Sequence, residues 1–278
     1  MRNRDLQTGL LIPLFVLLIP FGGASMARMV RAGARPSALS LAVVAVPGAF
    51  AVFHNQALLT EEKLPSIGLS YSNPFFISGY YENSLSLVCP LRSEVVAMSL
   101  SQSGVADYRE SSIGIALAKN LSGKLAAGIH LNYFDLSLPE AGRHKGSFQA
   151  DAGVRLRLSG NLLFGLHFSH LASSSIETMN YHVVFPLIIR GGASCRLTER
   201  ILLAGESIYE RMAGIGFRVG TEYNLRQSYW IRAGIATNPF QHSFGFGYRM
   251  KNFQLDFALV HHEILGFSPV FSIDINLK

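Results

Sequence analysis

Two histidines and a serine stand close together in the chain, at His167, Ser169 and His170. A serine beside a histidine is the pair that nucleophilic catalysis uses. In a β-strand, however, successive side chains point to opposite faces, so His167 and Ser169 share one face and His170 falls on the other. The three residues therefore do not form a complete catalytic group. We predict that they fill space as polar residues and that the protein is not an enzyme.

A metal or disulfide site is no better supported by the spacing of the ligand-type residues. His261, His262 and Glu263 are consecutive, and neighbouring side chains of a strand point apart rather than toward one ion. Cys89 and Cys195 fall on well-separated predicted strands, so the pattern leaves their pairing open. The sequence therefore predicts no metal and no cofactor.

Charged residues that share one parity of the predicted strands are more informative. A charge facing lipid in a membrane barrel costs roughly 2–4 kcal/mol, so such residues are expected to face the lumen. We predict a lumenal salt-bridge network that fills the barrel and holds a plug, and the alternative is a pathway for a polar or anionic solute. The predicted network consists of Asp151, Arg155, Arg157, Arg218, Glu222, Arg232, Arg249 and Asp256.

The composition favours a membrane protein built of strands. Of the 278 residues, 49% are hydrophobic and 15% are charged, whereas soluble domains carry about 25% charged residues. This balance excludes a disordered chain, and two cysteines exclude a disulfide-stapled scaffold. The 26 glycines, 19 phenylalanines and 10 tyrosines are typical of strands that alternate between lipid and a polar interior.

The N-terminus resembles a secretory signal peptide in all three of its regions. Arg2 and Arg4 form a basic start, residues 10–21 are apolar, and residues 25–27 fit a small-x-small cleavage site. The apolar run is shorter than the roughly 20 residues that a transmembrane helix needs. We therefore predict a cleaved signal peptide over residues 1–27, and the alternative is a retained anchor.

Residues 66–278 show the two-residue period of strands. Between 148 and 158, large apolar residues alternate with Gln149, Asp151, Gly153, Arg155 and Arg157. The segments approach the 9–11 residues of a tilted membrane-spanning strand, whereas soluble strands average about 5–6. Short turns such as 159–160 also alternate with longer connections such as 172–182 and 261–266. We predict an all-β fold, an antiparallel transmembrane barrel of about 14 strands. A soluble secreted β-sandwich is the alternative.

Residues 28–65 do not alternate well. Their first part is basic, their middle is small and apolar with Pro47 and Gly48 at its centre, and their end is polar. Because this stretch precedes the first predicted strand, we expect it to enter the lumen as a plug. Lumenal glycines would let its backbone approach the wall closely.

Two short motifs open the chain after the predicted signal peptide, at residues 33–39 and 49–58. They resemble the segment and the Ala-Val-x-x-Asn-Pro-Ala-x-Leu box that open the FadL-like barrels of the PorV/PorQ type, with Asn55, Ala57 and Leu58 matching the box and Gln56 replacing its proline. The run 108–133 and the closing segment 261–268 are also similar to theirs.

The resemblance implies a fourteen-stranded barrel with an N-terminal hatch in the outer membrane of a Gram-negative bacterium of the Bacteroidota. It implies a non-enzymatic accessory subunit of type IX protein secretion or envelope assembly. The alternative within the same group is a channel for hydrophobic small molecules. The expected partners are outer-membrane lipid, other envelope or secretion-complex proteins, and hydrophobic small molecules, but no nucleic acid.

Overall fold

The computed structural model describes residues 30–277, except for residues 107, 138–143, 178–181 and 212. The signal peptide that the sequence predicts over residues 1–27 lies outside the described residues. No helix in the described part of the chain combines the length and the apolar character needed to cross a membrane.

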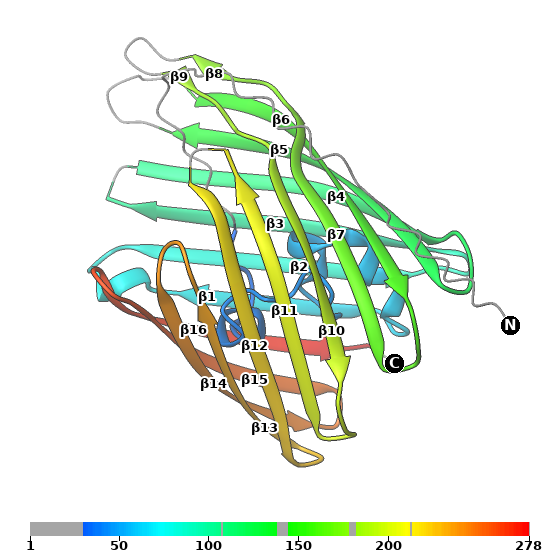
Figure 1. Ribbon diagram of the computed structural model, residues 1–278. Coiled ribbons are helices and arrows are strands. Elements are labelled where there is room, and N and C mark those ends of the chain that lie inside the picture. Colours follow the sequence, from blue (N-terminus) through cyan, green and yellow to red (C-terminus); the bar gives the residue numbers. More distant parts are fainter. Residues whose placement is uncertain (1–29, 107, 138–143, 178–181, 212, 278) are drawn as a thin grey trace, which may run out of the picture.

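Fourteen strands of the described residues close into one antiparallel barrel, as the sequence predicted (Figure 1). Each strand pairs with its neighbours in the chain, and β1 pairs with β16 to close the ring. β7 pairs with β10, because β8 (Ile176–Glu177) and β9 (His182–Val183) form a separate two-stranded hairpin. The barrel strands are β1 (Ser66–Ser72), β2 (Tyr81–Pro90), β3 (Glu94–Val105), β4 (Tyr108–Asn120), β5 (Leu125–Ser137), β6 (His144–Arg157), β7 (Leu162–Ser173), β10 (Ile188–Arg196), β11 (Ile201–Glu210), β12 (Gly214–Arg226), β13 (Tyr229–Ala236), β14 (Gln241–Met250), β15 (Phe253–His262) and β16 (Gly266–Asn276).

The alternation along each strand decides which side chains face outward. In β4, Ile113, Ile115 and Leu117 are exposed on the outer surface, whereas Ala116 and Ala118 are buried on the inner one. The strands run from 7 residues in β1 to 14 in β6, long enough for most of them to span the apolar band of a bilayer. The outer surface is therefore apolar and the inner surface is small or polar.

The connections differ in length between the two ends of the barrel. At one end of the barrel they are all short, and at the other end the longer ones include 73–80, which contains the 3-10 helix η2 (Pro74–Phe76), and 174–187, of which residues 178–181 lie outside the described part of the chain. The prediction of a longer connection at 261–266 is wrong, because β15 continues to His262 and β16 begins at Gly266. Only residues 263–265 connect these two strands.

The N-terminal segment, residues 30–65, lies inside the ring of strands (Figure 1). It contains α1 (Ala34–Ala38), α2 (Ala51–His54) and the 3-10 helix η1 (Gln56–Glu61). Its backbone packs directly on glycines of the inner wall, where any side chain would collide with it. A Cβ on these glycines would lie within 3 Å of the segment: Gly128 against Gln56, Gly165 against Val44, Gly220 and Gly234 against Leu39, and Gly245 against Ala38.

Candidate functional site

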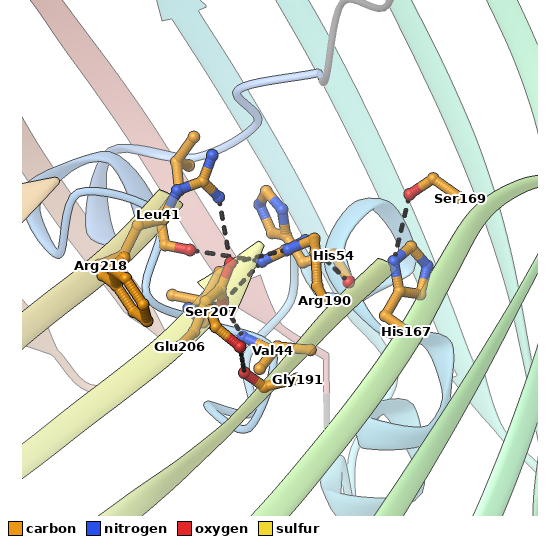
Figure 2. Close-up of polar contacts among 12 residues, drawn as sticks. Leu41, Val44, His54, His167, Ser169, Arg190, Gly191, Glu206, Ser207 and Arg218 are labelled. Atoms are coloured by element: carbon orange, nitrogen blue, oxygen red, sulfur yellow. Dashed lines mark hydrogen bonds and ion pairs between the residues drawn. The ribbon is translucent and has the colours of Figure 1, made fainter. Parts of the chain in front are cut away.

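A buried ion pair joins β10 and β11 on the inner side of the barrel wall (Figure 2). Arg190 Nε and Nη2 donate to the two carboxylate oxygens of Glu206 at 2.8 and 2.9 Å. Both side chains are fully buried. Arg218 of β12 also donates to Glu206, at 3.1 Å. Two cations therefore share one carboxylate, and such a buried charge needs every one of its hydrogen bonds.

The same pair holds the N-terminal segment. Glu206 Oε2 accepts from the backbone N–H groups of Val43 and Val44 at 3.0 and 2.9 Å. Arg190 donates to the carbonyl oxygens of His54 at 3.1 Å and Leu41 at 3.3 Å. Five hydrogen bonds therefore converge on Glu206, two from Arg190 and one each from Arg218, Val43 and Val44.

A second cluster contains four of the predicted network residues. Arg35 of α1 donates to Glu222 at 2.8 and 3.1 Å. Arg232 joins Glu222 and Asp256, at 2.6 Å in each case, and is itself buried. Arg249 donates to Gln254, which donates in turn to Asp256 at 2.8 Å. This cluster links α1 to the inner wall of β12, β13 and β15.

A third cluster fixes the end of the N-terminal segment. Arg155 and Arg157 of β6 both form ion pairs with Glu61 of η1, the first at 3.0 Å. Arg155 also donates to the hydroxyl of Thr60 at 3.0 Å. Of the predicted network residues, seven lie in these three clusters. Asp151 lies apart from them and contacts His130.

The three matched residues of the opening motif are all buried in the lumen. Asn55 Nδ2 donates to the carbonyl oxygens of Val44 at 2.7 Å and of Val154 in β6 at 3.1 Å, and Asn55 Oδ1 accepts from Ala57 N–H at 3.2 Å. Ala57 and Leu58 are completely covered. Asn55 therefore joins two parts of the segment to the wall.

The prediction that His170 falls on the outer face is wrong. A β-bulge opposite Ala150 and Ala152 interrupts the pairing of β6 and β7, and His170 has φ 56°. This left-handed residue breaks the alternation, so His170 lines the lumenal cavity together with Ser169. His167 lies on the inner face as predicted and contacts Ser169 at 3.2 Å. Cys89 and Cys195 are both free.

His54 gives the docked segment a dependence on pH. Burial and the neighbouring Arg190 lower the pKa of this histidine to about 4, whereas a released histidine titrates near 6.5. Between pH 6.5 and 4 the released segment binds a proton that the docked segment does not, so falling pH favours release. We expect docking to weaken by roughly 3 kcal/mol at the acid end.

Limited proteolysis of the N-terminal segment between pH 7 and pH 4.5 measures this effect. Cleavage should increase as the pH falls. The variant His54→Gln, which cannot titrate, should lose a large part of the increase. An identical pH profile for both proteins would contradict the role of His54.

A cavity and a groove lie on opposite sides of the same part of the wall. The lumenal cavity, about 110 Å³, is lined mainly by serine, asparagine and glutamine side chains and by Ala32 and Phe53 of the segment. The outer groove, about 680 Å³, is lined by apolar outward residues such as Leu69, Leu100 and Ile113. The two share the small residues Ser70, Ser84, Ser101 and Ser112 of β1 to β4.

The geometry can be compared with that of known proteins. No family model matches this chain, and no curated protein matches it in sequence. Solved structures do match. The CymD monoaromatic hydrocarbon channel superposes with a TM-score of 0.67 and 13% identity, covering 90% of this chain and 98% of that one. The fold is FadL-like.

Two further structures agree with this FadL-like barrel. The toluene transporter TbuX of Ralstonia pickettii has a TM-score of 0.63 and 12% identity, covering 87% of this chain and 98% of its own. A FadL homologue of Pseudomonas aeruginosa has a TM-score of 0.63 and 11% identity, with 87% and 97% covered. At such identities the likeness shows the fold alone. The PorV/PorQ type and the Bacteroidota source stay predictions.

Proposed function

We propose that this protein is an outer-membrane channel for hydrophobic small molecules. The observation that carries the proposal is the match, over nearly the whole length of both chains, to barrels that are themselves hydrocarbon channels. This favours the alternative that the sequence left open over the secretion-accessory prediction. No feature of the described residues favours an accessory role, which therefore stays a prediction.

The outer surface supports a position in a membrane. Large apolar side chains are exposed on strand after strand, among them Phe148, Phe217 and Phe244, each more than half exposed. A water-soluble protein rarely exposes contiguous apolar surface on this scale. Lipid is the solvent that such a surface fits, and the outer membrane is where barrels of this kind are found.

The N-terminal segment supports a route through the wall rather than straight down the bore. The segment is tied to β6, β10, β11, β12 and β13 by the three ion-pair clusters, and we infer that it acts as a plug. Beside it, the residues that line both the lumenal cavity and the apolar outer groove are mostly serines, together with Asn83 and Gln102. We propose that hydrophobic molecules cross between β1 and β4 and leave into the lipid.

Uptake of radiolabelled toluene by cells that lack their own hydrocarbon channels tests this function. Cells that express the full chain should take up toluene several-fold faster than cells with an empty vector. Ser112→Leu, which places a large side chain in the shared wall, should remove most of that gain, and Ser159→Leu, in an exposed turn, should not. Toluene uptake equal to that of the empty vector, with the protein folded in the membrane, would refute the proposal.

A further inference from the structure

Three side chains on the inner face of β3, β5 and β6 form a chain of hydrogen bonds. Ser99 Oγ lies 2.8 Å from His130 Nε2, and His130 Nδ1 lies 3.1 Å from Asp151 Oδ2. All three residues line the lumenal cavity. The imidazole therefore contacts a hydroxyl through one nitrogen and a carboxylate through the other. In this arrangement a histidine can accept the proton of a serine nucleophile.

The register of four strands brings these residues together. His130 lies directly opposite Asp151 in the β5–β6 ladder. Ser99 lies opposite Gly114 of β4, so the imidazole has to reach across β4 to contact it. A Cβ on Gly114 would lie 2.2 Å from His130 Nε2 and 2.8 Å from Ser99 Oγ. The missing side chain at Gly114 is therefore what lets the histidine reach the serine.

The carboxylate is held from its other side. Asp151 Oδ1 accepts from the backbone N–H of His170 at 2.8 Å. This N–H is supplied by the bulge that turns His170 inward. With one oxygen on the backbone and the other on the ring, Asp151 orients the imidazole, which is the task of the carboxylate in such a triad.

An amide donor lies beside the triad. Asn132 and Gln149 stand in the same cross-strand row as Gly114 and Ser99 and share one hydrogen bond of 3.3 Å. Gln149 is 7% exposed, and its Nε2 has no partner among the described residues. If the oxygen and nitrogen of both amides are exchanged, the group without a hydrogen-bond partner is the NH₂ of Asn132 instead. Either way the cavity contains a donor that could stabilise an oxyanion.

We propose that Ser99 is a nucleophile that hydrolyses short-chain acyl esters in the lumenal cavity. Ser99 Oγ attacks the ester carbonyl carbon while its proton passes to His130 Nε2. The ester C–O bond then breaks, His130 returns the proton to the departing alcohol, and an acyl-serine remains. Water, deprotonated by His130, attacks that acyl group and releases the carboxylic acid and free Ser99.

The cavity indicates the class of substrate. Its volume is about 110 Å³, so it suits a short ester rather than a long acyl chain, and its lining combines serine, asparagine and glutamine side chains with the charged Arg31, Glu82 and Glu110. The proposal does not depend on hydrocarbon transport. Toluene uptake tests transport and covalent labelling of Ser99 tests hydrolysis, so either function can fail while the other holds.

Covalent labelling with diisopropyl fluorophosphate tests the site directly. An activated serine forms an O–P bond with this reagent, and the P–F bond breaks with release of fluoride and the serine proton. Mass spectrometry of the labelled full chain in detergent should place the phosphoryl group on Ser99. Ser99→Ala should abolish this label, and Ser103→Ala, four residues further along β3 on the same inner face, should not.

Two further variants separate an activated serine from a merely reachable one. His130→Gln and Gly114→Ala should each slow labelling of Ser99 by roughly a hundredfold, because both remove the base from the hydroxyl. His130→Gln gives the answer if Gly114→Ala does not fold, and heat-modified migration in gels reports folding for each. No label on Ser99 in the folded wild type, or equal labelling in folded His130→Gln, would overturn the proposal.

Discussion

Glu206→Ala is expected to lower the free energy of unfolding by about 3–5 kcal/mol, the usual cost of breaking a buried ion pair from one side. The substitution leaves Arg190 and Arg218 without the carboxylate that they share, at a place where Arg190 has no contact with solvent. It also frees the N–H groups of Val43 and Val44. Urea unfolding in detergent micelles measures the change.

The control for this substitution is Glu199→Ala, in the exposed turn between β10 and β11. It removes the same charge without a buried partner and should change the stability by less than about 0.5 kcal/mol. Equal effects of the two substitutions would mean that the Arg190–Glu206 pair does not hold the fold together.

Gly165→Val is expected to displace the N-terminal segment from the wall. A Cβ at this position would lie 1.9 Å from the carbonyl oxygen of Val44, which belongs to the backbone and cannot rotate away. Overpacking of this kind costs about 1–3 kcal/mol, and it falls on the contact between segment and wall rather than on the barrel ladder. Planar-bilayer recordings should therefore show open events that the wild type lacks.

The matched control is Gly205→Val, in the middle of strand β11, where an added Cβ meets nothing within 4 Å. This variant should keep the wild-type conductance. Closed recordings for Gly165→Val, with the barrel folded, would show that the segment does not determine whether the bore is open.

The barrel could be predicted from sequence because its signal is local. Alternation along each strand, as between Phe148 and Arg157, needs only the geometry of one extended chain. The parity of the charged residues followed from the same geometry, and the structure places seven of them in lumenal clusters. The partners of those charges did not follow, because a partner depends on which strands are neighbours and in which register.

The features missed by the sequence are all consequences of register or of irregular backbone. Arg190 and Glu206 lie on strands that the alternation argument did not treat, although a charge next to a glycine on each was a usable signal. Ser99, His130 and Asp151 come from three strands, and His130 reaches Ser99 only because the strand between them carries Gly114. The inward turn of His170 comes from a bulge, which simple alternation cannot predict.

Hydrogen exchange of the full chain in lipid nanodiscs tests most directly whether residues 30–65 are packed inside a closed barrel. The backbone N–H groups of Leu39, Val43 and Val44 are buried and bonded within the segment or to Glu206. Peptides that cover them should exchange as slowly as peptides from β11 and β12. Exchange as fast as that of an unstructured peptide, beside protected strands, would contradict the account.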